Sequence, residues 1–256
     1  GLATTDNKKY LRLWFELSHE KMTLGCKSRE EARESGNKWF PYNKGGDFRR
    51  WYGNNEYFVN WQFDGAEIKS DVIKKYPYLN GNPDFVTKNQ DYYFKSGITW
   101  TYINSAFLGM RLSPDGFVFD VAGSSVFPPA DIQYAVLGYL CSKISKMFID
   151  VINPTVNIQA GNIGKLPVIM AAMDAVKSDS IEKLVCMSKS DWDSYETSWD
   201  FNRVTLLYRA EKTGNLDADY ENLLSHWSSS VVEMRRLEEE NNRIFIEAYG
   251  LNGEVA

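Results

Sequence analysis

The sequence predicts an α+β fold, in which a mixed-sheet domain precedes a helical region with a long C-terminal helix. Three observations lead to this prediction. Strand-like and helix-like patterns alternate up to Pro167, strand-like patterns disappear after it, and an apolar stripe at helical spacing runs from Asp217 to about Tyr249. We therefore place a boundary near residue 168, with the α+β domain over residues 1–167 and the helical region over residues 168–256.

The first elements are a short helix, a loop and a strand. Residues 10–17 fit helical spacing and strand alternation equally, so their conformation stays open. Ser28 begins a capping-box pattern, and Gly36 ends the helix that follows. Residues 39–46 are rich in turn-forming residues and predict a loop, whereas residues 56–61 predict a strand.

The next elements are a hairpin, a long amphipathic helix and two short strands. Segments 105–112 and 117–121 flank Ser113-Pro114-Asp115-Gly116, which favours a type I turn and hence a hairpin. Asp131 is expected to cap a helix over 131–151, and short strands are expected over 156–159 and 163–166. The buried side of the helix would carry Ile132, Ala135, Val136, Tyr139, Leu140, Ile144, Met147, Phe148 and Val151.

The last element is the long helix from residue 217 to about residue 249. Its apolar stripe changes face midway, which fits a helix packed on its own domain and fits equally a connector packed against another helix, as in a coiled coil. Within this helix, Glu238, Glu239 and Glu240 are expected to form a solvated face.

The composition limits the class of protein. With 256 residues, 43% hydrophobic and 25% charged, the chain is neither disordered nor collagen-like, and it has no apolar run long enough to span a membrane. Three cysteines far apart (Cys26, Cys141 and Cys186) favour reduced thiols in the cytoplasm. The chain begins with glycine, without an initiator methionine or a signal peptide, which we expect of a piece of a longer protein.

The charge is distributed unevenly. The net charge is −5, but residues 1–170 carry 20 Lys and Arg against 17 Asp and Glu, whereas residues 171–256 carry 9 against 17. The first part of the chain is therefore mildly basic, which permits a polyanionic partner.

Residues 38–52 form the most unusual local sequence. Cations alternate there with aromatic residues and asparagines, a mixture that suits phosphate, base-edge and stacking contacts with nucleic acid. A half-buried aromatic strand edge with solvated charges and a sugar-binding platform are the alternatives that composition leaves open.

Catalytic and metal-binding patterns are missing from the sequence. His19 and His226 lack an accompanying acid cluster or nucleophile motif. Residues 82–85 and 153–156 match only part of the Asn-Pro-Pro-aromatic motif of amino-methyltransferases, and no strand leads into a Gly-x-Gly helix start. We therefore predict no catalytic, cofactor-binding or metal-ligating residue.

Several blocks carry a family resemblance. Residues 1–7 with 11–14 resemble the junction after the catalytic domain of large adenine-specific DNA methyltransferases. Lys38–Gly46 with Arg49–Asn54 is similar to the block that follows in BREX, PglX-type members. Later similar blocks are Gly97–Trp100, Gly123–Phe127, Asn153–Pro167, Ser198–Phe201 and Asn242–Leu251.

The resemblance implies a target-recognition-like domain that reads double-stranded DNA, followed by a helical region. The parent enzyme would transfer a methyl group from S-adenosylmethionine to adenine N6, with its cofactor pocket and catalytic motif upstream of Gly1. Thr5 stands where the family usually has glycine, so the opening turn is expected to differ.

We accordingly expect the DNA-recognition segment of a site-specific adenine-N6 methyltransferase from a bacterial restriction–modification or phage-defence system. The segment itself would bind no cofactor and be inactive alone. Its expected partners are double-stranded DNA, the upstream methyltransferase domain and other defence-system subunits, in the cytoplasm and away from membranes. The residues expected to contact DNA are Lys44, Arg49 and Arg50, with Asn43, Trp51, Tyr52, Asn54, Asn55, Ser124, Ser125, Asn157 and Gln159.

Two other functions stay open. The chain could be a non-catalytic interaction module whose acidic helices dock a partner subunit, in which case polar substitutions of Leu237 and Ile244 should release the partner. Alternatively, its tryptophans could bind a glycan, whose affinity would change little with salt.

Overall fold

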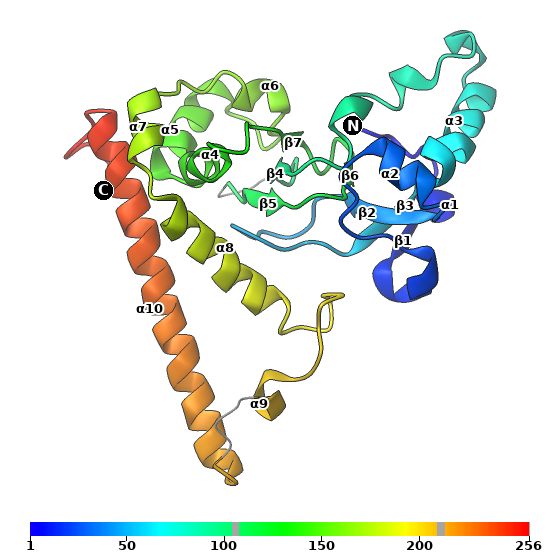
Figure 1. Cartoon of the computed structure of the whole chain (residues 1–256). Helices are drawn as coiled ribbons and strands as arrows, with labels where there is room; N and C mark the ends of the chain where they lie inside the picture. The colour runs from blue at the N-terminus through cyan, green and yellow to red at the C-terminus, as the bar shows by residue number, and fades with distance from the viewer. Residues whose placement is uncertain (104–107, 209–212, 256) are drawn as a thin grey trace.

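The computed structural model describes residues 1–103, 108–208 and 213–255. Two small sheets lie beside a group of helices, and one long helix extends away from them (Figure 1). The predicted α+β class is confirmed. The four-stranded sheet has the order β1 (Leu11–Leu13), β3 (Tyr57–Asn60), β2 (Trp39–Asn43) and β6 (Val118–Phe119). The three-stranded sheet has the order β5 (Arg111–Ser113), β4 (Gly97–Thr99) and β7 (Ser125–Val126).

The four-stranded sheet is mixed, because β1 and β2 are antiparallel to β3 while β6 is parallel to β2. Its core includes Phe40, Val59 and Trp61. The associated helices are α1 (Asn7–Tyr10), α2 (Arg29–Glu34) and α3 (Gln62–Lys75). Short 3-10 helices cover Trp14–Glu16, His19–Lys21, Pro77–Leu79, Pro83–Phe85 and Gln90–Tyr92.

Three sequence predictions concern the first part of the chain. The sequence leaves the conformation of residues 10–17 open. This segment contains the last residue of α1, then strand β1, then a 3-10 helix. The Ser28 hydroxyl accepts a hydrogen bond from the Glu31 amide at 3.1 Å and caps α2, as predicted. The strand predicted over residues 56–61 is β3.

The loop predicted over residues 39–46 is wrong in its first part, which is strand β2. Every residue of β2 is buried, and Pro41 lies opposite Phe58 while β6 joins β2 only from Tyr42 onward. The turn begins at Gly45 and Gly46, whose φ values are +88° and +133°. Aromatic side chains buried on both faces therefore outweighed the proline and asparagine signals that suggested a loop.

The hairpin predicted around residues 113–116 is also wrong. Strand β5 pairs with β4 in one sheet, and β6 pairs with β2 in the other, so the turn carries the chain between sheets. The local turn pattern marks a change of direction but does not determine which strand pairs with which. Residues 104–107 of the predicted first strand lie outside the described residues.

The predicted helix over residues 131–151 is divided into α4 (Gln133–Leu140) and α5 (Lys143–Ile152). The Ser142 hydroxyl caps α5 by accepting from the Ser145 amide at 3.3 Å. Asp131 is exposed and caps nothing, since Ile132 precedes α4 without a side-chain cap. The break redirects the chain, and Val151, predicted to be buried, is 80% exposed.

The strands predicted over residues 156–159 and 163–166 do not form. Asn157 makes only an isolated bridge to Ile103. The helix α6 (Ala160–Ile163) begins directly afterwards, where the Gln159 amide donates to Asn162 Oδ1 at 2.8 Å. Capping contacts of this kind compete with strand pairing in short polar segments.

The helical region is confirmed, and its last helix is continuous from Leu216 to Ala248 (α10). It also contains α7 (Met170–Ala175), α8 (Ser178–Trp192) and α9 (Thr205–Tyr208). The second half of α10 packs against α4, α5, α7 and α8, whereas α8 and α10 diverge toward α9 (Figure 1). The larger hydrophobic core draws residues from both sides of Pro167. No helix in the described part of the chain has the length and hydropathy of a membrane span.

Candidate functional site

The residues predicted to contact a ligand lie in two regions. The first, which we call the loop cluster, consists of residues 44–46, 100–103, 120–125 and 155–159. The second, which we call the helix groove, lies between α8 and α10 and is floored by residues 48–51. The aromatic-basic loop, residues 44–52, connects the two.

The loop cluster is held together by residues 100–103. The Thr101 hydroxyl donates to the Gly46 carbonyl at 3.0 Å, and the Trp100 amide donates to the Ser124 carbonyl at 3.0 Å. The Ile158 amide donates to the Tyr102 carbonyl at 2.8 Å. The loops that carry Lys44, Ser124, Ser125, Asn157 and Gln159 therefore meet at one place, although they are far apart in sequence.

Glycine is required where the aromatic-basic loop leaves β2. A Cβ atom at Gly45 would lie 2.7 Å from the Ala122 carbonyl oxygen, and one at Gly46 would lie 2.9 Å from the Asn54 side-chain amide. The loop thus folds tightly against residues 120–125 and against itself, which fixes the position of Lys44. The Lys44 ammonium forms an ion pair with Asp120.

Several predicted contact residues already have intramolecular partners. The Asn43 and Asn54 amides donate to Ser113 Oγ at 2.8 Å and to the Asp47 carbonyl at 2.7 Å. Ser124 and Ser125 donate to nearby backbone carbonyls. Asn55 is buried and its Nδ2 has no partner among the described residues. Asn157 and Gln159 are exposed. These side chains shape the loops, and their contact with DNA stays a prediction.

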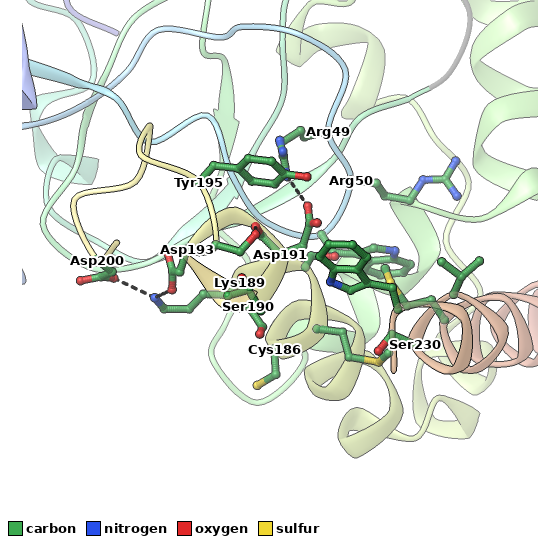
Figure 2. Close-up of a pocket in the computed structure, with 18 of the residues that line it drawn as sticks. Arg49, Arg50, Cys186, Lys189, Ser190, Asp191, Asp193, Tyr195, Asp200 and Ser230 are labelled. Carbon is green, nitrogen blue, oxygen red and sulfur yellow. Dashed lines mark hydrogen bonds and ion pairs between the residues drawn. The ribbon is translucent and has the colours of Figure 1, made fainter. Parts of the chain in front are cut away.

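The helix groove has a volume of about 1660 Å³. Figure 2 shows Arg49 directed at Asp191 and Lys189 between Asp193 and Asp200, with Ser230 marking the α10 side. Arg49 Nη1 lies 3.0 Å from Asp191 Oδ2, and the guanidinium sits 4.8 Å from the centre of the Trp192 ring. The cation is thereby fixed by a carboxylate and an aromatic face of the same helix.

Glu238 of α10 joins the helical region to the aromatic-basic loop. It lies 3.2 Å from Arg50 Nη1 and accepts a hydrogen bond from Trp51 Nε1 at 2.7 Å. Trp51 is 1% exposed and its backbone has a φ of +72°. The expectation that residues 238–240 form one solvated face is therefore wrong at Glu238. No local pattern could have revealed this contact, since its partners are nearly 190 positions away.

Tyr52 and Lys189 form a second link between the loop and the helical region. The Lys189 ammonium lies 5.4 Å from the centre of the buried Tyr52 ring. Burial raises the pKa of Tyr52, so its hydroxyl remains protonated at neutral pH. Burial also lowers the pKa of Lys189, but hydrogen bonds to Asp193 and Asp200 outweigh it, and the pKa lies above its usual value. Lys189 therefore stays charged.

Arg111 is the cation that the sequence prediction missed. It is 2% exposed, and its Nη1 donates to the Gly109 carbonyl at 3.1 Å and lies 3.5 Å from the Arg49 carbonyl. Burial, and then the charge of Arg49, lowers the pKa of Arg111 to about 10. No carboxylate forms an ion pair with it within residues 1–103, 108–208 and 213–255. A buried cation without a counter-ion is costly and is typical of functional sites.

Metal ligation receives no support among the described residues, and two of the three cysteines are buried. No group of three or more His, Cys, Asp or Glu side chains there is arranged to hold a metal ion. Burial raises the pKa of Cys26 to about 11 and that of Cys141 to about 12, so both thiols are protonated at neutral pH. The convergent cations and aromatic rings are the chemistry that the site offers.

Comparisons with known proteins find two long relatives. The chain is 33% identical over 260 aligned residues, its whole length, to the adenine-specific methyltransferase PglX of Lacticaseibacillus casei (strain Zhang). It is 31% identical, over 96% of its length, to the adenine-specific methyltransferase BrxX of Escherichia coli O9:H4 (strain HS). These matches cover 21% and 19% of the relatives, so the chain spans about one fifth of their length. No protein-family model matches it. The predicted resemblance is confirmed: the chain matches a segment of these enzymes.

Proposed function

We propose that this chain, which matches a segment of adenine-specific methyltransferases over its whole length, is the part of such an enzyme that recognises the DNA sequence. The observation that carries the proposal is the position of Arg49 and Arg50 on the aromatic-basic loop, where both line the helix groove, next to the polar loop cluster. Guanidinium groups suit phosphate and guanine, and exposed loop amides suit base edges.

The proposed mechanism divides the work between the two regions. Arginines at the helix groove would hold phosphates and set the register of the duplex, while Asn157 and Gln159 of the loop cluster would meet base edges. The remainder of the longer enzyme would flip the target adenine and transfer a methyl group from S-adenosylmethionine to its N6 atom. Loops braced by two sheets and a helical core give such contacts a rigid frame.

This mechanism requires that two ion pairs of the structure be broken. Arg49 and Arg50 are bound to Asp191 and Glu238, so a phosphate must replace these carboxylates to make the contact. Breaking these ion pairs reduces the binding free energy that each phosphate contact contributes. We therefore expect the affinity for DNA to be modest and to fall steeply with salt.

The described residues do not fit S-adenosylmethionine. A nucleoside cofactor suits a strand that leads through glycines into a helix N-terminus. Here the glycines after β2 lead into a loop, and the space beside them is filled by the Ala122 carbonyl and the Asn54 side chain. We propose that the cofactor binds in another part of the longer enzyme, and we derive no step through it.

The test is a salt titration of duplex DNA binding by the full-length enzyme, measured by fluorescence anisotropy. Replacing Arg49 and Arg50 with alanine should weaken binding and reduce the slope of log Kd against log salt concentration by about two. The control carries the same loss of charge at Arg33 and Arg235, which are exposed and do not line the groove. Unchanged affinity of the first variant, or wild-type affinity that ignores salt, would contradict the proposal.

A further inference from the structure

Two exposed side chains of the loop cluster lie on the same face. Ile103 and Asn157 are partners in an isolated antiparallel bridge. Residues directly opposite each other in such a pair carry their side chains on one face, with Cβ atoms about 5 Å apart. Ile103 is 66% exposed, and Asn157 is exposed as well. An aliphatic side chain and an amide therefore lie next to each other on the surface of the cluster.

The backbone beneath this pair is fixed. Ile158 is buried, its amide donates to the Tyr102 carbonyl at 2.8 Å, and its carbonyl accepts from the buried Trp100 indole at 2.9 Å. The Asn157 carbonyl accepts a hydrogen bond from Asn153 Nδ2 at 2.8 Å. The side-chain amide of Asn157 makes no hydrogen bond to another described residue, so its donor and its acceptor are available to a ligand.

The loop cluster has almost no net charge. Lys44 and Asp120 are the only charged residues within 44–46, 100–103, 120–125 and 155–159, and they form an ion pair with each other. The exposed apolar residues there are Ile103, Val121 and Val156. These segments therefore offer no unpaired cation to a phosphate, and they contain no arginine, which is the commonest partner of guanine.

An A·T base pair presents the matching groups in the major groove of DNA. Adenine presents its N7 acceptor and N6 donor, which an asparagine amide binds with two hydrogen bonds. The paired thymine presents a C5 methyl group, which packs against an apolar side chain. A G·C pair has no such methyl group, and its O6 and N7 acceptors favour arginine or lysine. An amide beside an aliphatic side chain thus fits A·T better than G·C.

We propose that the loop cluster reads one A·T pair of the recognition sequence through the major groove, with Asn157 on adenine and Ile103 on the thymine methyl group. This inference rests on the proposed recognition of DNA and adds which base pair this part of the site selects. The pair is not that of the target adenine, which leaves the helix for methylation. Ile103 is absent from the residues predicted from sequence, because only its bridge to Asn157 brings it to the site.

Base analogues test the two contacts separately. The probes are short duplexes that carry the recognition sequence of the full-length enzyme, identified from the methylated adenines in the genome of its host. In one set each thymine is replaced in turn by deoxyuridine, which lacks only the C5 methyl group. In the other set each adenine is replaced in turn by 7-deazaadenine, which lacks the N7 acceptor. Fluorescence anisotropy measures binding by the full-length enzyme.

At one A·T pair, deoxyuridine should weaken wild-type binding about fourfold, and 7-deazaadenine at least about fivefold. Ile103→Ala should remove the response to deoxyuridine at that pair, and Asn157→Ala should remove the response to 7-deazaadenine. Val232→Ala is the control for Ile103→Ala, because Val232 is 68% exposed on α10 and lies outside the loop cluster. This control should keep both responses. Thermal unfolding followed by circular dichroism verifies that the variants fold.

Two results overturn the proposal. In the first, no A·T pair other than that of the target adenine responds to either analogue. In the second, Ile103→Ala and Asn157→Ala respond to the analogues as the wild type does. If the wild type still prefers the recognition sequence to a scrambled duplex, either result leaves the proposed function standing. Equal wild-type affinity for the two duplexes would contradict the proposed function, and this inference with it.

Discussion

Glu238 is the residue through which α10 holds the aromatic-basic loop. It accepts a hydrogen bond from the Trp51 indole, which is buried, and it pairs with Arg50, whose side chain is 24% exposed. We expect Glu238→Gln to lower the free energy of unfolding by about 1–2 kcal/mol, because glutamine keeps an acceptor for Trp51 but loses the charge that balances Arg50. Urea denaturation measures this difference.

The matched control is Glu239→Gln. The Glu239 side chain is 63% exposed, and among the described residues it pairs only with Arg235 on the same helix, so its substitution should change stability by less than about 0.5 kcal/mol. Equal effects of the two substitutions would show that Glu238 does not link the two parts of the chain.

Arg111 is expected to cost stability at neutral pH. Its guanidinium is buried without a carboxylate among the described residues, and burial lowers its pKa to about 10. Because the unfolded chain holds this proton more tightly, the cost is fully present below pH 10 and is relieved as the pH rises through that value. Arg111→Met should therefore be neutral or stabilising at pH 7 by on the order of 1–2 kcal/mol.

Urea denaturation of the wild type and of Arg111→Met at pH 7 and pH 10 tests the direction of this pH dependence. The stability advantage of the variant should shrink at the higher pH. A variant that is strongly destabilised at pH 7 would mean that Arg111 serves the fold through its contacts with the Gly109 and Arg49 carbonyls.

At the scale of elements, α4 and α10 meet at a glycine. A Cβ atom on Gly138 would lie 2.8 Å from Asn241 Oδ1 and 3.0 Å from Ile181 Cδ1. Asn241 is itself held by a hydrogen bond from its Nδ2 to the Gly138 carbonyl at 2.9 Å. Gly138→Ala should therefore destabilise the chain by about 1–3 kcal/mol, although alanine is the better helix former.

Gly161 in α6 is the matched control for this helix contact. A Cβ atom there meets nothing within 4 Å. Gly161→Ala should raise the free energy of unfolding by about 0.5–1 kcal/mol, as expected for an open helical position. Thermal or urea unfolding of the two variants separates the effect of close helix packing from the effect of helix propensity. If Gly138→Ala stabilised the chain, the packing argument would be contradicted.

Elements also show what local patterns can predict. The cap at Ser28 and the long helix α10 are correct because each depends on neighbouring residues within a few turns. The single helix over residues 131–151 was wrong because apolar spacing continued across Ser142, whose side chain instead begins a new helix. The hairpin was wrong because strand partners are chosen by the sheets and not by the turn.

At the scale of the whole molecule, the mildly basic first part meets the acidic helical region directly. The pairs Arg49–Asp191, Arg50–Glu238 and the Tyr52–Lys189 contact join the two. Removing residues 168–256 would take away both carboxylates and leave the arginines without partners. The charge difference between the two parts of the chain thus stabilises their association as well as permitting an anionic ligand.

The sequence by itself determined the α+β class, the helical C-terminal part, the α2 cap, the charge asymmetry and the resemblance to adenine-specific methyltransferases. Tertiary structure alone decided that Arg49 and Arg50 face carboxylates of α8 and α10, that Arg111 is buried beside the Arg49 backbone, and that Val231 of the α10 stripe is 66% exposed. The physical reason is the separation along the sequence of the residues that determine each feature. Caps and periodicity are read within a few turns of chain, whereas these contacts join side chains up to nearly 190 positions apart, and an apolar stripe does not specify what covers it.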